Sequence, residues 1–213
     1  MIRLSLAAAS ALILAACATE PAPGPQPEPG AVVVPSGYEL GVATAGELRA
    51  AGNVPAAIQR LMQLAGDPDL TPDQKASVLF DLGQLSKGPG GYDLAGSLSY
   101  FDEIIATYPG TEWARRAEAE LAPTRAALDA QNAIAASPDS TPSEKFNALM
   151  KLGRHFDAID LMTSFSIEPD NEVKLAMYQI GYLCDEAGLT GQSYTVTDRD
   201  GTVRTLRFCD YGK

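Results

Sequence analysis

The chain has 213 residues, of which 27 are Asp or Glu and 16 are Lys or Arg, so its formal net charge at pH 7 is −11. Such a surface repels phosphate backbones and anionic lipid headgroups, which argues against nucleic-acid binding and against electrostatic binding to membranes. The length is sufficient for one domain or a repeat array, and the 46% of hydrophobic residues are enough to give it a real core.

The first element is an N-terminal segment with the layout of an export signal. Arg3 precedes an apolar stretch, residues 4–16, that is too short to span a membrane. The sequence Leu14-Ala15-Ala16-Cys17 resembles the bacterial lipobox. The resemblance implies that residues 1–16 are a lipoprotein signal peptide and that Cys17 is acylated, for instance with palmitate, and becomes the first residue of the mature protein.

The lipobox resemblance also implies a location. Asp directly after the lipidated cysteine commonly retains such lipoproteins in the inner membrane, and this chain has Ala18 there. We therefore expect a protein anchored by lipid in the outer membrane and facing the periplasm. The alternative is an ordinary cleaved signal peptide with a coincidental cysteine at position 17.

Residues 17–37 follow as the lipidated cysteine and a proline-rich linker. Alternating prolines prevent a helix and favour extended polyproline II, a semi-rigid spacer with a rise of about 3.1 Å per residue. The prolines of this segment are Pro21, Pro23, Pro25, Pro27, Pro29 and Pro35.

Residues 38–170 are rich in Ala and Leu at helical spacing, with breaks at Gly and Pro, and predict a mainly α fold built of helical hairpins. Two breaks indicate where helices begin. Thr71 precedes Pro72 and Thr141 precedes Pro142, which is the arrangement of an N-cap residue followed by a proline in the first turn.

An internal repeat relates two of these hairpins. The first copy consists of Gly52, Ala57, Ile58, Leu61, Leu64 and Pro68. The second copy, 101 residues later, consists of Gly153, Ala158, Ile159, Met162, Phe165 and Pro169. The glycine permits a tight turn, and the alanine permits close approach of two helices.

This spacing resembles the tetratricopeptide repeat, whose period of about 34 residues fits three times into the shift. The resemblance implies a solenoid of about four degenerate units. Leu82-Gly83, Ser97 and Phe101 match one intervening unit. Trp113 begins another, looser match over residues 110–140, with a second helix at about Pro123–Ala136, and a single long helix pair is the alternative for this stretch. The run 100–117 is also similar to units of periplasmic lipoproteins that assist outer-membrane assembly, pilus assembly or cell division. A generic helical bundle is the alternative.

The tetratricopeptide resemblance further implies a partner-binding groove lined by the first helix of each unit. Phe80 would anchor the partner and the lysines would pair with its acidic groups, although core packing of Phe80 is equally possible. The expected groove residues are Phe80, Gln84, Lys87, Asn147, Met150 and Lys151.

Residues 171–213 predict a capping helix, up to Gly188, followed by a β-hairpin around Asp200-Gly201. Cys184, on the helix, and Cys209, after the second strand, could then form a disulfide, as an oxidising periplasm favours. Two separate buried thiols are the alternative. We expect the hairpin to pack its apolar face on the helix, and the members of that face are Tyr194, Val196, Leu206 and Phe208.

No set of catalytic residues is recognisable. His155 is the single histidine, at a helix start that is usually exposed to solvent, and Asp102 and Glu103 diverge by about 100° on a helix. No metal-ligand spacing appears, and Lys87–Gly91 lacks the Lys-Ser/Thr pair of a phosphate-binding loop. We therefore expect no enzyme, no metal site and no cofactor.

Together these patterns predict a lipid-anchored scaffold or adaptor. It would bind envelope proteins or peptides within a machine for outer-membrane assembly, pilus assembly or secretion, or division-linked wall synthesis. A peptidoglycan-active or peptidoglycan-binding envelope protein is the alternative, and a periplasmic carrier of a small ligand is a further one.

Overall fold

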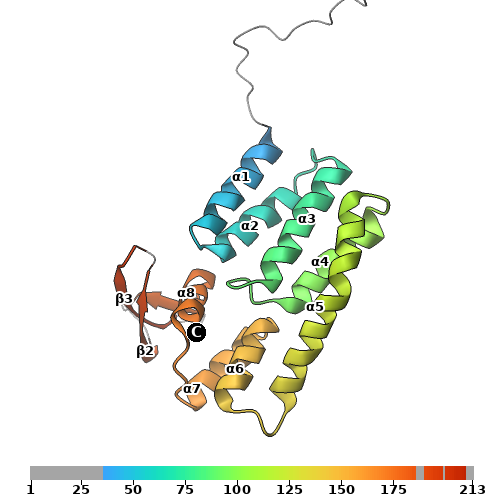
Figure 1. Ribbon diagram of the computed structural model, residues 1–213. Coiled ribbons are helices and arrows are strands. Elements are labelled where there is room, and N and C mark those ends of the chain that lie inside the picture. Colours follow the sequence, from blue (N-terminus) through green and yellow to red (C-terminus); the bar gives the residue numbers. More distant parts are fainter. Residues whose placement is uncertain (1–35, 186–189, 199, 210–213) are drawn as a thin grey trace, which may run out of the picture. The chain divides into compact units, whose positions relative to one another are not determined.

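The computed structural model describes residues 36–185, 190–198 and 200–209 (Figure 1). The chain divides into two units, residues 1–34 and residues 35–213, and all elements described below belong to the second. The expected signal peptide and Cys17 lie outside the described residues. So does the expected linker, except that its last two residues already belong to the first helix and its cap.

The described part of the chain is mainly helical and ends in a small antiparallel sheet, as expected. Its helices are α1 (Gly37–Ala50), α2 (Val54–Ala65), α3 (Pro72–Lys87), α4 (Leu94–Thr107), α5 (Glu112–Ala136), α6 (Pro142–Lys151), α7 (His155–Ser164) and α8 (Asn171–Ile180). Its strands are β1 (Leu183–Asp185), β2 (Thr190–Thr197) and β3 (Val203–Phe208), in the order β1-β3-β2. Within these residues, no helix combines the length and the apolar character needed to cross a membrane.

Local capping chemistry sets the starts of the helices where the sequence predicted them. The Thr71 hydroxyl accepts a hydrogen bond from the Gln74 backbone N–H, and the Thr141 hydroxyl accepts one from Glu144. In both cases the side chain of that third residue in turn accepts a hydrogen bond from the backbone N–H of the threonine, which makes a capping box. A proline directly after the threonine begins the first turn.

The two copies of the internal repeat share their turn geometry. Gly52 and Gly153 both have positive φ, 80° and 76°. The Gly52 N–H donates to the Arg49 carbonyl at 2.8 Å, and the Gly153 N–H donates to the Met150 carbonyl at 3.0 Å. The correspondence ends further along, because Leu64 is 5% exposed and its counterpart Phe165 is 59% exposed.

Helix α5 corrects the expected hairpin at residues 112–136. The structure has one continuous helix of 25 residues, with Pro123 inside it, in place of a second helix beginning at Pro123. Pro123 has no N–H to donate to the Ala119 carbonyl, but Ala119 is exposed, so water can bind that carbonyl. No glycine in this stretch offers a turn.

The described residues form two separate hydrophobic cores, which helix α5 connects. The first core lies among α1 to α4 and the first half of α5, with Leu61, Phe80 and Phe101 at its centre. The second lies among α6, α7, α8 and the sheet, with Met162 and Tyr194 at its centre. Helix α5 runs from one to the other.

The C-terminal region differs from expectation in where its helix ends. Helix α8 ends at Ile180 because Gly181 adopts a left-handed conformation and its N–H returns to the Met177 carbonyl. Cys184 therefore lies on β1, which pairs with β3, and not on the helix. The disulfide with Cys209 is confirmed, with Cα atoms 5.3 Å apart.

The predicted apolar face of the β2–β3 hairpin is confirmed. Tyr194, Val196 and Leu206 are at most 1% exposed and belong to the second core. The Phe208 ring meets the edge of Tyr194.

The sequence predicted that the last helix covers one end of a solenoid. In the structure α8 contacts α2 as well as the sheet, so it does not lie at a free end (Figure 1). The Gln179 side-chain amide donates to the Gly52 carbonyl at 3.4 Å. The last helix therefore returns to the first helical hairpin.

Side chains of α8 cover the outer edge of β2. The Asn171 side-chain amide donates to the Thr197 carbonyl and accepts from the Thr197 N–H, each at 3.0 Å. The Lys174 ammonium donates to the Thr195 carbonyl at 3.2 Å and pairs with Glu168. Covering an edge in this way prevents strand addition by another chain.

Candidate functional site

The loop between α3 and α4, residues 88–93, is the point where the two cores meet. Its Gly90 packs against Val54 of α2. Asp93 forms an antiparallel bridge with Leu152 at the end of α6, and the Tyr92 carbonyl lies 3.1 Å from Nε2 of His155. This loop is built tightly, since the Asp93 N–H returns to the Ser86 carbonyl at 2.8 Å.

Two cavities, of about 520 and 440 Å³, adjoin this loop and share the lining residues Pro89 and Glu172. We call them together the central cleft. Its lining comes from both cores and from α5, and comprises Arg49, Gly52, Val54, Lys87, Gly88, Pro89, Gly90, Tyr92, Leu94, Ala127, Gln131, Lys151, Asn171, Glu172, Leu175, Ala176 and Gln179.

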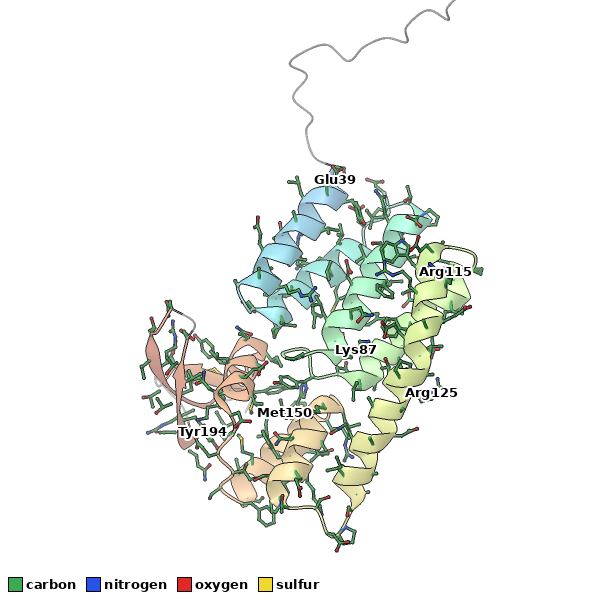
Figure 2. All side chains as sticks on the ribbon, in the orientation of Figure 1. Glu39, Lys87, Arg115, Arg125, Met150 and Tyr194 are labelled. Carbon is green, nitrogen blue, oxygen red and sulfur yellow. A yellow bond between two sulfur atoms is a disulfide. The ribbon has the colours of Figure 1, made fainter. Side chains whose placement is uncertain are left out.

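Three cations reach the central cleft from the ends of three helices. Arg49 lies in the last turn of α1, Lys87 in that of α3 and Lys151 in that of α6. Lys87 is labelled in Figure 2. Each cation also offsets the partial negative charge at the carboxyl end of its own helix. Among the described residues that line the cleft, Glu172 is the single carboxylate.

Lys87 is held by neighbours on α5. Its ammonium lies 2.6 Å from Glu120, and the Gln84 side-chain amide donates to the same carboxylate at 2.8 Å. The hydrogen bond from Lys87 is the main reason that the pKa of Glu120 is lowered. The arrangement fixes Gln84 and Lys87 at the boundary between α3 and α5.

A smaller cavity of about 120 Å³ shares Arg49 with the central cleft and contains Asp81 among apolar side chains such as Val42 and Leu61. Burial raises the pKa of Asp81, and the positive charges of Arg49 and Arg116 oppose that rise only in part. The ionised carboxylate is therefore in an unfavourable setting.

The expected groove residues separate into three groups. Gln84 lines the smaller cavity, and Lys87 and Lys151 line the central cleft. Asn147 is exposed but does not line the cleft.

Phe80 and Met150 belong to the cores instead, at 5% and 1% exposure. The Phe80 ring packs against the rings of Phe101 and Trp113, and Arg116 stacks over its face. The expectation that Phe80 anchors a partner is corrected, because the ring has no accessible face to offer.

His155 is also placed differently from expectation. It is half-buried, with Nε2 near the Tyr92 carbonyl and its ring edge-on to Tyr182, and therefore braces the contact between the two cores. Among the described residues, no group of three or more His, Cys, Asp or Glu side chains is arranged to hold a metal ion.

An apolar surface lies around another cavity, of about 360 Å³, that includes Ile58, Met62, Tyr100 and Ile180. Met62 is 54% exposed. The charged side chain in its lining, Asp93, already accepts a hydrogen bond from the Gly96 N–H. The carboxylate of Asp93 thus serves as the N-cap of α4, and the rest of this lining is mainly apolar.

Sequence reasoning found two of the three cations of the cleft and missed Arg49 and Glu172. Arg49 occupies the last turn of its helix, as Lys87 does, so a comparison of helix ends could have found it. Glu172 joins the cleft only because α8 returns to the first hairpin, for which the sequence carries no signal. Comparisons of the chain with protein-family models, curated proteins and solved structures give no match.

Proposed function

We propose that this chain is a lipid-anchored periplasmic adaptor that holds a segment of a partner protein in the central cleft. The proposal combines the lipobox at Cys17 with the likeness of the helical hairpins to tetratricopeptide units. Its setting would be an envelope machine for outer-membrane assembly, pilus assembly or secretion, or division-linked wall synthesis.

The central cleft is the observation that supports this proposal best. Its cavities are lined by a mixture of apolar, polar and charged side chains, which is the lining that a peptide segment requires. Three of the groove residues inferred from sequence alone, Gln84, Lys87 and Lys151, belong to the cleft or to the cavity beside it.

A steric block within living cells tests whether the cleft holds a partner. A photo-crosslinking amino acid at Gln131, in the cleft, should capture an envelope protein that mass spectrometry identifies. Ala127→Trp, which fills the cleft, should abolish that product. Ala126→Trp is the matched control, since Ala126 is the neighbouring exposed residue of α5 and does not line the cleft.

The outcome of that experiment is decisive for the adaptor. A product that forms equally with Ala127→Trp, or that is absent from Gln131 altogether, contradicts the proposal. A crosslinker at Arg125 controls for random collision because Arg125 is exposed and lies elsewhere on α5 (Figure 2).

Membrane anchoring is tested separately at the lipobox. Cys17→Ser should release the protein from the membrane fraction and remove the mass of the acyl chains, whereas Ala18→Ser should leave both unchanged. Ala18→Asp should move the protein to the inner membrane. An acylated, membrane-bound Cys17→Ser variant would exclude Cys17 as the anchor.

A further inference from the structure

We infer that the segment recognised in the central cleft is acidic: an extended peptide whose carboxylates pair with Arg49 and Lys151. The inference rests on the proposed adaptor function and names the chemistry of its partner.

The charges of the cleft run against those of the whole chain. The chain has 27 acidic and 16 basic residues, yet the described lining of the cleft has three basic side chains, Arg49, Lys87 and Lys151, and one acidic side chain, Glu172. A region of opposite sign on an acidic protein attracts anionic partners and repels cationic ones.

Two of the three cations are available to a ligand. Lys87 is already paired with Glu120. Among the described residues, neither Arg49 nor Lys151 has a carboxylate within the 4.0 Å of an ion pair. They come from different cores, so a ligand that meets both must lie along the cleft across the loop 88–93.

Helix-end electrostatics explains each cation singly but not the scarcity of carboxylates in the described lining of the cleft. Arg115 provides the contrast, because it is exposed on α5 and pairs with Glu112, three residues before it. Among the described residues Arg49 and Lys151 form no such ion pair, and both line the cleft. The carboxylate whose charge interacts with Arg49 is that of Asp81, which lies in the smaller cavity and has a raised pKa.

Glu172 opposes an acidic ligand and so provides a variant that should gain affinity. It lies in the first turn of α8 and shares the cleft with Tyr92, whose pKa it helps to raise after the larger effect of burial. Removing its charge removes the repulsion of incoming carboxylates without filling or enlarging the cavity.

The test measures fluorescence anisotropy of a short labelled peptide in which Glu alternates with Ala, added to the purified full-length chain. The same peptide with Gln in place of every Glu is its matched control. We expect the Glu peptide to bind about tenfold more tightly than the Gln peptide at low salt, with the difference shrinking as salt is added.

Charge variants then assign the interaction to the cleft. Arg49→Glu and Lys151→Glu should each weaken binding of the Glu peptide about fivefold or more, and Glu172→Gln should strengthen it about threefold. Arg125→Glu, on the exposed part of α5 outside the cleft, should leave it unchanged. Unchanged circular dichroism spectra and urea midpoints show that the variants are folded. If Lys151→Glu does not fold, Lys151→Gln takes its place.

Equal binding of the Glu and Gln peptides, no binding of either, or an effect of Arg125→Glu as large as that of Lys151→Glu would overturn the inference. The adaptor proposal fails on a different observation, namely loss of the Gln131 crosslink or its persistence in Ala127→Trp. A neutral partner segment identified by that crosslink would retain the adaptor and reject the acidic ligand.

Discussion

Replacing Gly83 by alanine sets two known effects against each other. Gly83 lies within α3, where alanine is favoured over glycine by about 1 kcal/mol. A Cβ at this position would, however, lie 2.5 Å from Cε1 and 2.9 Å from Cζ of the Phe101 ring. Phe101 is fully buried, and the Ser97 hydroxyl of the same helix donates to the Gly83 carbonyl at 2.7 Å, so neither helix can withdraw freely.

Forcing a methyl group into such a core costs about 1 to 3 kcal/mol. The net expectation for Gly83→Ala is therefore a loss of about 1 kcal/mol in the free energy of unfolding, after the helix-propensity gain is subtracted. Gly46→Ala is the matched control, because Gly46 is an exposed residue of α1 and its Cβ would meet no atom within 4 Å. That variant should gain about 1 kcal/mol.

Urea unfolding followed by far-UV circular dichroism measures both variants. A second measurement places Phe101→Leu in each background, and the two changes should couple because they share one contact. If Gly83→Ala is stabilised as much as Gly46→Ala, the helices α3 and α4 do not approach as closely as described, and the reasoning is wrong.

Three further outcomes are expected. Reducing the disulfide between Cys184 and Cys209, which are 25 residues apart, should lower the free energy of unfolding by about 3.5 kcal/mol in the chain-entropy model, with no effect of reductant on a double Ser variant. Asp81→Asn should stabilise the protein at neutral pH. Burial raises the pKa of Asp81, so the stability contributed by its protonated form is present at acidic pH and is lost as the pH rises through the folded-state pKa. Urea titrations of wild type and variant should therefore converge as the pH is lowered below the ordinary pKa of Asp, and a constant difference would contradict this. Asn171→Ala should free the edge of β2 at Thr197 and promote self-association, which sedimentation velocity would detect. A sedimentation coefficient equal to that of the wild type would argue that Lys174 alone is sufficient to protect the edge.

The helix starts and turns that could be read from the sequence are those fixed by neighbours in the chain. Thr71 and Thr141 cap their helices through residues three positions away, and Gly52 and Gly153 turn the chain within one loop. Such features need no knowledge of the rest of the fold.

The features that the sequence did not reveal depend on distant contacts. The end of α8 at Gly181 had a competing glycine at position 188, and the choice is tied to the pairing of β1 with β3. Pro123 marks a break in most helices but is accommodated here, where the freed carbonyl is on an exposed residue.

The candidate site shows the same division. Lys87 and Lys151 were predicted from the first-helix positions that the tetratricopeptide resemblance implies, whereas the cleft they share exists because the loop 88–93 meets α6 and α8. The sequence left Phe80 open between groove and core, because a large aromatic residue has the same spacing in either place, and its burial decides for the core.

The uninterrupted helix α5 has a mechanical consequence. Its first half packs in one core and its second half supports the other, and Pro123 lies between them with one backbone hydrogen bond missing. Bending stiffness along α5 is therefore lowest at that point, and the contacts of the loop 88–93 and of α8 are what hold the two cores together beside it. The space that Arg49 and Lys151 face is therefore spanned by α5 on one side and fixed on the other by the Asp93–Leu152 bridge and the Gln179–Gly52 hydrogen bond.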